Sequence, residues 1–97
     1  MSTRVQEAPI AERIVRLIRD RGGWAQRVFA TPYGHPTVDI LGCLEGRMIQ
    51  FEVKAPGAKA TERQLATLDR WARAGAITGV VYSEADALGL LLAREFG

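Results

Sequence analysis

The sequence predicts an α/β fold in which helices flank a mixed central sheet. Apolar residues recur at helical spacing in the first twenty residues and again after Thr61, a pattern typical of amphipathic helices. Between these segments, residues 38–54 read as two strands folded on a turn at Glu45-Gly46. A helix between the third and fourth strands implies a right-handed parallel connection. The expected order is therefore helix, three strands, helix, strand, helix.

The first helix is expected from about Gln6 to Arg21, followed by the helix-ending pair Gly22-Gly23. Pro9 is compatible with a helix only in its first turn, because proline lacks the backbone N–H. The apolar stripe consists of Ile10, Ile14, Leu17 and Ile18.

Two further helices carry clear start signals. Thr61 and Gln64 have the spacing of a capping box, and Gly75 closes the helix that follows. Its inward positions are expected to be Leu65, Leu68 and Ala72, with Trp71 near them. Ser83 is expected to cap the last helix, with Asp86 at its third position, and that helix runs through Leu88, Leu91 and Leu92.

The strands are expected at Trp24–Ala30, on each side of the Glu45-Gly46 turn, and at Ile77–Tyr82. With a loop centred on Glu45-Gly46, Leu44 faces Arg47 and Asp39 faces Glu52. Glu is a poor residue for the positive φ of a type I′ turn, and an odd-length loop would shift this register by one.

Asp39 and Glu52 are the residues that point to chemistry. Like charges directly opposite each other in a sheet are destabilising, so the two carboxylates need a shared proton or a cation. A hard divalent ion such as Mg²⁺ suits oxygen ligands of this kind. Lys54 lies two residues beyond Glu52 and points to the same side. Two carboxylates and one ammonium group can hold a metal, orient a water and stabilise charge on a phosphate.

A third acid comes from the first helix. At about 100° per residue, Glu7 falls in line with Ile14 and Ile18, whereas Glu12 falls on the opposite side. Glu7 has two interpretations on this pattern: an acid that faces the site, or an N-terminal acid favoured by the helix dipole.

Composition sets broad limits. The chain has 97 residues, of which 47% are hydrophobic and 25% charged, and its formal net charge is +2. These values predict one domain spanning residues 1–97, mildly basic and compatible with a nucleic-acid partner. The lone cysteine, Cys43, excludes an internal disulfide and favours a cytoplasmic location; we expect its thiol to be buried. No apolar run approaches the roughly 20 residues that span a bilayer, so no membrane association is expected.

The ordered set of Glu7, Asp39, Glu52 and Lys54 resembles the site residues of the PD-(D/E)XK nucleases. The closer resemblance is to their VRR-NUC branch, which is related to Holliday-junction resolvases and common in phages. The resemblance covers nearly the whole chain. One departure is that Thr37 and Val38 intervene between Pro36 and Asp39, where the family has adjacent Pro and Asp. The matching positions are Glu7 with its helix, Arg27, Gly34-His35-Pro36, Asp39, Glu52-Val53-Lys54-Ala55-Pro56-Gly57, Thr61, Gln64, Gly75 and 80–86.

The resemblance implies a restriction-endonuclease-like core and a metal-dependent DNA endonuclease acting on branched or Holliday-junction DNA, with no small-molecule cofactor. It implies that Mg²⁺ or Mn²⁺ is held by Asp39, Glu52, the Val53 carbonyl and Glu7. Lys54 would orient the attacking water or stabilise charge on the phosphoryl oxygens. Gln64 would lie near the site, in addition to or instead of its capping role.

The DNA contacts are less specific. Lys59 and Arg63 are expected to contact phosphate, although each could be an ordinary surface charge. Arg27 occupies a position where the family usually has a basic residue, and the resemblance implies that it contacts nucleic acid. A histidine in a loop is most often a polar surface residue without a function. For His35 the functional interpretation is contact with the substrate. A homodimer is expected from the resemblance. The alternatives are a non-catalytic nucleic-acid-binding module with a nuclease-like fold, and a small interaction domain that binds no nucleic acid.

Overall fold

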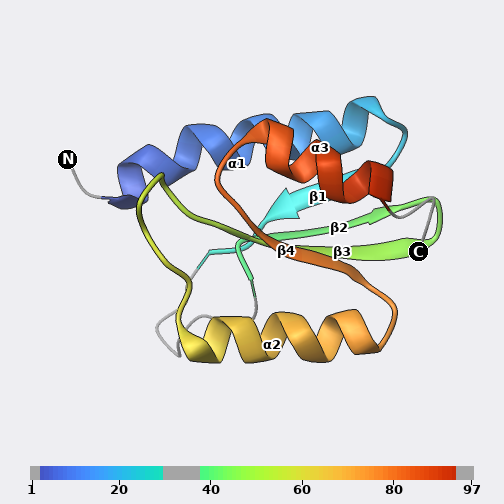
Figure 1. Cartoon of the computed structure of the whole chain (residues 1–97). Helices are drawn as coiled ribbons and strands as arrows, with labels where there is room; N and C mark the ends of the chain where they lie inside the picture. Colours follow the sequence, from blue (N-terminus) through green and yellow to red (C-terminus); the bar gives the residue numbers. More distant parts are fainter. Residues whose placement is uncertain (1–2, 30–37, 94–97) are drawn as a thin grey trace.

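One four-stranded sheet lies between two layers of helices. A computed structural model describes residues 3–29 and 38–93. The strand order is β1-β2-β3-β4, with β1 (Trp24–Arg27), β2 (Ile40–Leu44) and β3 (Arg47–Val53) antiparallel, and β4 (Ile77–Val81) parallel to β3. Helices α1 (Thr3–Asp20) and α3 (Glu84–Ala93) cover one face, and α2 (Glu62–Arg73) covers the other (Figure 1). The mixed sheet and the element order confirm the predicted fold class.

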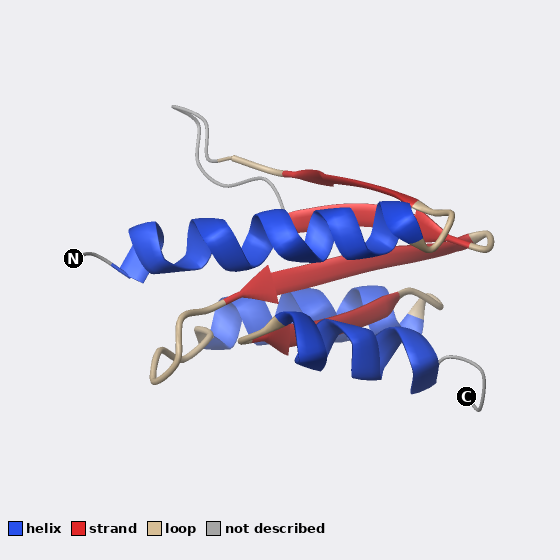
Figure 2. Cartoon of the chain, turned by 90° about the horizontal axis from the view of Figure 1, so that it is seen from above, coloured by secondary structure: helices blue, strands red, loops and turns tan. Residues whose placement is uncertain are grey.

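The core fills the space between the sheet and the α1–α3 layer. Strand alternation turns Ile49, Phe51 and Val53 of β3 toward that layer, where they are buried. The apolar stripe of α1 meets them with Ile10, Ile14 and Ile18, all buried. Figure 2 shows α1 lying along the sheet, beside β1 and β2. The opposite face of β3 is therefore free to carry polar residues.

Helix α1 is longer at its N-terminus than expected. It begins at Thr3, so Pro9 lies inside the helix rather than in its first turn. The prediction of a start near Gln6 was wrong: Pro9 lies beyond the first turn, where its missing N–H and its ring weaken the helix but do not end it. At the other end, Gly22 has a φ of +93°, and the Gly23 N–H donates to the Ile18 carbonyl at 3.0 Å. This is the glycine-ended stop that the sequence predicted.

The hairpin register is as predicted. Leu44 pairs with Arg47 and Ile40 pairs with Phe51, which leaves a two-residue turn of Glu45 and Gly46. Both turn residues have positive φ, 51° and 80°, as in a type I′ turn. Glu45 therefore accepts a conformation that glutamate rarely adopts, and the register of the whole hairpin depends on it.

All four strands are shorter than expected, and β3 ends at Val53 rather than at Lys54. The first ends at Arg27 instead of Ala30, the last ends at Val81 instead of Tyr82, and β2 begins at Ile40. Asp39 consequently lies just before β2, in a bend rather than in the strand. The backbone nevertheless stays close to β1 there, since the Val28 N–H donates to the Asp39 carbonyl at 2.7 Å.

Helix α2 buries less than its apolar pattern indicated. Leu68 is buried, but Leu65 is 51% exposed, Trp71 is 38% exposed and Ala72 is exposed. The cause is placement: α2 packs mainly on β3 and β4 rather than on the β1–β2 half of that face. For the same reason Cys43 of β2 is exposed, and the prediction of a buried thiol was wrong.

The helix caps follow the sequence. Thr61 and Gln64 form a capping box at the start of α2. The Asp86 N–H donates to Ser83 Oγ at 3.1 Å at the start of α3, which buries Leu91 but leaves Leu92 exposed. Within the described ranges, no helix combines the length and apolar character that crossing a bilayer requires.

Candidate active site

The predicted chemical residues meet where β3 ends. Glu52 and Lys54 come from the end of β3 and the residue after it, Asp39 from the bend before β2, and Gln64 from the first turn of α2. Glu7 reaches the same end of the sheet from α1. Five residues that are up to 57 positions apart in the chain (Glu7 to Gln64) are thus collected by one strand end.

Glu52 is the buried centre of this group. It is only 3% exposed, and its Oε1 accepts a hydrogen bond from Gln64 Nε2 at 3.1 Å. The Lys54 ammonium lies 3.9 Å from the same oxygen. Burial, together with a hydrogen bond to Asp39 and the Asp39 and Glu7 charges, raises the pKa of Glu52 to about 8, although the Lys54 charge acts in the opposite direction. The carboxyl group is therefore mostly protonated at neutral pH.

Asp39 is fixed by the backbone of β3. Its Oδ2 accepts the Val53 N–H at 2.9 Å. The neighbouring Lys54 N–H instead donates to Val81 in β4 at 3.0 Å. Because the N–H and C=O of one strand residue point to the same side, the Val53 carbonyl is directed away from β4, toward the side on which Asp39 lies. The structure thus brings Asp39, Glu52 and the Val53 carbonyl to one place.

Gln64 makes the predicted capping contact and also contacts Glu52. Its Oε1 accepts the Thr61 N–H at 2.9 Å, which is the capping contact. Its Nε2 donates to Glu52. The capping contact therefore fixes which end of the amide faces the carboxyl group, and one side chain ties the start of α2 to the site.

The two helix acids separate as predicted. Glu7 Oε2 accepts the Ala55 N–H at 3.1 Å, just beyond Lys54. Glu12 is exposed and binds Arg27 at 2.9 Å. Glu7 is thus the α1 acid at the site, where it is held by a backbone N–H.

The donor set fits a hard divalent cation. Among residues 3–29 and 38–93, no three or more His, Cys, Asp or Glu side chains converge in an arrangement that could hold a metal ion. What the chain offers instead is two hydrogen-bonded carboxyl groups and one carbonyl, in a place where burial opposes the negative charge of Glu52. A cation can replace the proton between two such carboxylates, and oxygen donors are those that Mg²⁺ and Mn²⁺ prefer.

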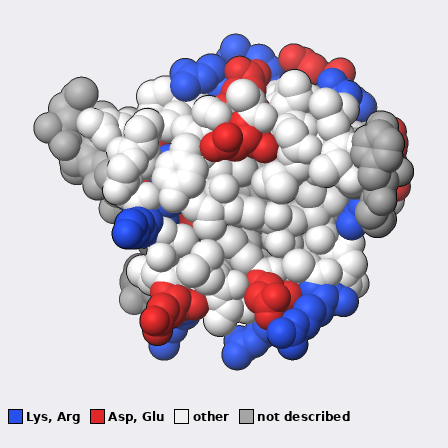
Figure 3. Space-filling view, in the orientation of Figure 1, with Lys and Arg blue, Asp and Glu red and all other residues white. Residues whose placement is uncertain are grey.

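The predicted DNA-contacting residues differ in their surroundings. Arg27 is already bound to Glu12, and its guanidinium also lies over the Phe29 ring, 4.6 Å from the centroid. Lys59 and Arg63 are exposed in the loop before α2 and in its first turn, beside the Gln64 cap. Basic and acidic side chains are mixed along α2, at the bottom of the view in Figure 3. His35 lies outside the described residues.

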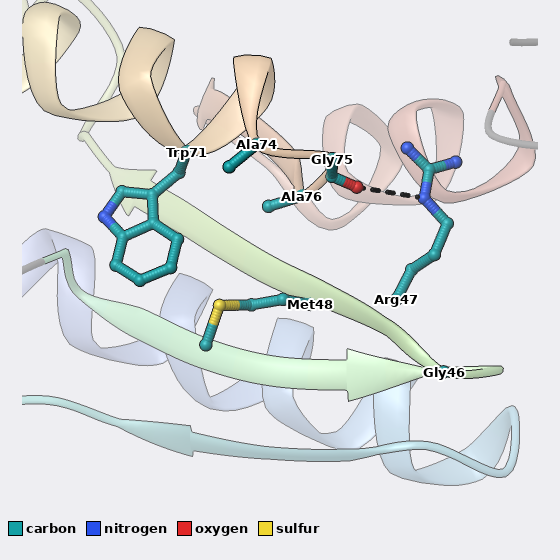
Figure 4. Close-up of a pocket in the computed structure, with 7 residues that line it drawn as sticks. All are labelled: Gly46, Arg47, Met48, Trp71, Ala74, Gly75 and Ala76. Atoms are coloured by element: carbon teal, nitrogen blue, oxygen red, sulfur yellow. Dashed lines mark hydrogen bonds between the residues drawn. The ribbon is translucent and has the colours of Figure 1, made fainter.

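A pocket of about 270 Å³ lies at the other end of β3. Met48 and Trp71 point toward each other across it, and Arg47 Nε donates to the Gly75 carbonyl at 3.3 Å (Figure 4). Its lining contains no carboxylate: Gly46, Arg47, Met48, Trp71, Ala74, Gly75 and Ala76. The pocket is therefore separate from the acidic cluster and lacks its chemistry.

A solved structure titled "VRR_NUC domain" matches the chain over 90% of its length and 95% of that structure's own chain, with a TM-score of 0.72 and 22% identity. The protein has the VRR_NUC fold. No protein-family model matches the sequence, and neither does any curated protein. The fold expected from the resemblance is thus supported by shape over almost the whole chain.

The raised pKa of Glu52 predicts how stability changes with pH. Because its pKa of about 8 in the folded state exceeds the ordinary value of 4.5, Glu52 favours the folded state most below pH 4.5, and this contribution is lost as the pH rises through 8. In metal-free buffer, Glu52→Gln should therefore lose less melting temperature than wild type between pH 5 and pH 8.5. Thermal melts across this range measure the difference; parallel curves for the two proteins would contradict it.

Proposed function

We propose that the protein is a metal-dependent DNA endonuclease that hydrolyses phosphodiester bonds in branched DNA, including Holliday junctions. The observation that supports it most directly is the buried Glu52 carboxyl group, held between Asp39, Lys54 and Gln64 at the end of β3. Such a cluster weakens a small core, which makes a purely structural role a poor explanation.

Each residue has a role that follows from its position. Asp39, Glu52 and the Val53 carbonyl would hold Mg²⁺ or Mn²⁺, with Glu7 beside them. Such an ion supplies Lewis acidity, which stabilises charge on a phosphoryl oxygen and lowers the pKa of water. The Lys54 ammonium orients the attacking water or stabilises the developing charge. Water adds to phosphorus, the bond to one sugar oxygen breaks, and that oxygen takes up a proton.

The substrate contacts would come from the same end of the molecule. Lys59 and Arg63 are exposed beside the cluster, where they are suited to contact phosphates on either side of the cleaved bond. Arg27 would first have to leave Glu12, or contact DNA with the guanidinium N–H groups that do not bind Glu12. A cytoplasmic location suits an enzyme with the single thiol of Cys43.

The test is cleavage of matched linear, flapped and four-way DNA with Mg²⁺, with Mn²⁺ or with EDTA. We expect cleavage with either metal, none with EDTA, and a preference for branched substrates. Binding without cleavage under all these conditions would favour the non-catalytic module, and the absence of salt-sensitive binding would favour an interaction domain.

Glu7 should matter more than Glu12 for cleavage. Glu7→Gln alters the acid beside Ala55 and Lys54, and an effect of roughly 10-fold or more is expected from loss of a group that supports the site. Glu12→Gln removes an exposed ion pair with Arg27, which is worth about 1 kcal/mol at most. Steady-state cleavage rates of the two variants decide this; equal losses would contradict the assignment of Glu7.

The active form is expected to be a homodimer. One site cuts one strand, and symmetric resolution of a junction needs two sites related by a two-fold axis. Sedimentation at micromolar protein should give a mass near twice that of the chain, which is 10.6 kDa. Intact junction resolution by a protein that sediments only as a monomer would contradict this expectation.

A further inference from the structure

The outer edge of the sheet carries two exposed aromatic rings, each stacked with an arginine. The Arg19 guanidinium lies 4.0 Å from the centroid of the Trp24 ring, and that of Arg27 lies 4.6 Å from the Phe29 centroid. Trp24 is 59% exposed and Phe29 is 62% exposed. We call these four residues the β1-edge stripe. From this arrangement we propose that the β1-edge stripe binds unpaired nucleotides of the DNA substrate by base stacking.

The stripe is ordered by the backbone of an edge strand. The Ala25 carbonyl accepts hydrogen bonds from Arg19 Nε at 3.1 Å and from Arg19 Nη2 at 2.9 Å. These contacts hold the guanidinium plane against Trp24, so the ring is oriented before any ligand binds. They also occupy an edge carbonyl of β1, which disfavours the addition of a protein strand there.

The stripe leads to the candidate active site. Phe29 follows Val28, whose N–H donates to the Asp39 carbonyl at 2.7 Å. Trp24 lies five residues away, about 16 Å in an extended chain. Because residues 24 and 29 are an odd number apart, strand alternation turns Trp24 and Phe29 to opposite faces of β1. A nucleic-acid strand that contacts both rings would therefore cross the β1 edge and enter beside Asp39.

The exposed face of α1, the helix that supplies Arg19 to the stripe, is mostly basic and favours a polyanion. Arg13, Arg16 and Arg21 are exposed and have no ion-pair partner among the described residues. Two acids lie among them: Glu12, which is bound to Arg27, and Asp20. Figure 3 shows basic side chains gathered along the border that α1 occupies, at the top of the view, with some acidic ones beside them.

The exposed rings specify unpaired rather than paired bases. In duplex DNA the base faces are stacked on one another, and only their edges are open in the grooves. An aromatic ring on a protein surface can stack only on a base that is free of its neighbours, and an arginine behind the ring adds a cation–π contribution. Single exposed aromatic residues are common and need no ligand. Two arginine-backed rings on one sheet edge, leading to the acidic cluster, are by contrast an arrangement suited to binding unpaired bases.

This inference rests on the nucleic-acid-binding part of the proposed function, and not on hydrolysis. The test therefore uses the full chain in EDTA, where cleavage is not expected. The chain contains two tryptophans, so Trp71→Phe leaves Trp24 as the only one, and Trp24→Phe leaves only Trp71, which lines the pocket with Met48. An eight-nucleotide oligothymidylate, within the site sizes of about 4–16 nucleotides known for single-strand binders, is titrated into each protein. Saturable quenching is expected for Trp71→Phe and not for Trp24→Phe.

Affinity provides the second measurement. Trp24→Ala should weaken binding of the oligothymidylate about 5- to 100-fold, since one base stack is lost. Trp24→Phe should restore most of the affinity, and binding of a blunt duplex should change less than about 2-fold, because a duplex offers no free base face. If Trp24→Ala does not fold, the quenching experiment and Trp24→Phe still decide the matter. Unquenched Trp24, or equal losses on oligothymidylate and duplex, would overturn the proposal. If Trp24 is quenched but the protein cleaves no DNA with either metal, base stacking on the β1-edge stripe would be supported and the proposed nuclease activity would be contradicted.

Discussion

Asp39→Asn is expected to abolish cleavage while leaving the metal-free fold as stable as wild type at pH 7 and more stable at pH 9. Removal of a residue that only hydrogen-bonds to a metal ligand already lowers metal affinity or activity about 10- to 100-fold. Asp39 is itself a proposed metal ligand, so the loss of cleavage rate should exceed about 100-fold. The substituted amide keeps an oxygen that can accept the Val53 N–H, so the backbone contact survives.

The stability effect follows from the pair of carboxyl groups. At pH 7 Glu52 is mostly protonated, since its pKa is about 8, and repulsion between the two side chains is small. At pH 9 both would be charged in wild type, and the Asp39→Asn substitution removes one of the two charges. A gain of about 1 kcal/mol would raise the melting temperature of a chain of this size by about 4–8 °C.

Metal should distinguish the two proteins further. Mg²⁺ or Mn²⁺ that binds only the folded state stabilises it by mass action, so millimolar metal should raise the melting temperature of wild type and do much less for Asp39→Asn. Thermal melts with and without metal at pH 7 and pH 9 measure both effects. A metal-free Asp39→Asn protein that melts well below wild type, together with a wild type that does not respond to metal, would mean that Asp39 is structural.

The hairpin shows why much of this site could be predicted from sequence. Strand alternation has a fixed period of two, so the single turn signal at Glu45-Gly46 was enough to place Asp39 beside Glu52. The same regularity separated Glu7 from Glu12 on α1. These relations are local and geometric, and the observed contacts of Asp39 with Val53 and of Glu7 with Ala55 agree with them.

What depends on tertiary placement could not be predicted in the same way. The apolar pattern of α2 predicted an inward-facing Leu65, and a lone free thiol predicted a buried Cys43, but neither signal contains information on how far across the sheet the helix extends. Because α2 stops over β3 and β4, both side chains are exposed. The contact between Arg19 and Trp24 could not be predicted from the sequence either, since neither residue belongs to a helical or strand pattern that would indicate a site.

Gln64 marks the boundary between these two kinds of inference. Its capping role follows from spacing alone, as part of Thr61-x-x-Gln64. Its donor contact to Glu52 requires that α2 begin at the end of β3, which is a property of the fold. Once the cap fixes the amide, however, the direction of the Nε2 group is no longer free. A local signal thereby determines part of the chemistry of the site.

Lys54→Ala is expected to separate catalysis from metal binding. Lys54 contributes no oxygen ligand, and its ammonium group lies 3.9 Å from Glu52 Oε1. Its removal should lower the cleavage rate roughly 10²- to 10⁴-fold, the range for loss of a group that positions a proton or stabilises developing charge.

The metal response should survive this change. The Lys54 charge lowers the pKa of Glu52, so its loss makes Glu52 harder to ionise and shifts metal binding to higher pH without removing a ligand. At pH 8.5, Lys54→Ala should keep most of the rise in melting temperature that wild type shows with Mg²⁺. Lys54→Arg, which retains the charge, is the matched control for the pH shift. If Lys54→Ala shows no metal-induced rise in melting temperature at any pH, Lys54 acts by holding the carboxylates in place. If the variant cleaves DNA at nearly the wild-type rate, Lys54 has no role in the cleavage reaction.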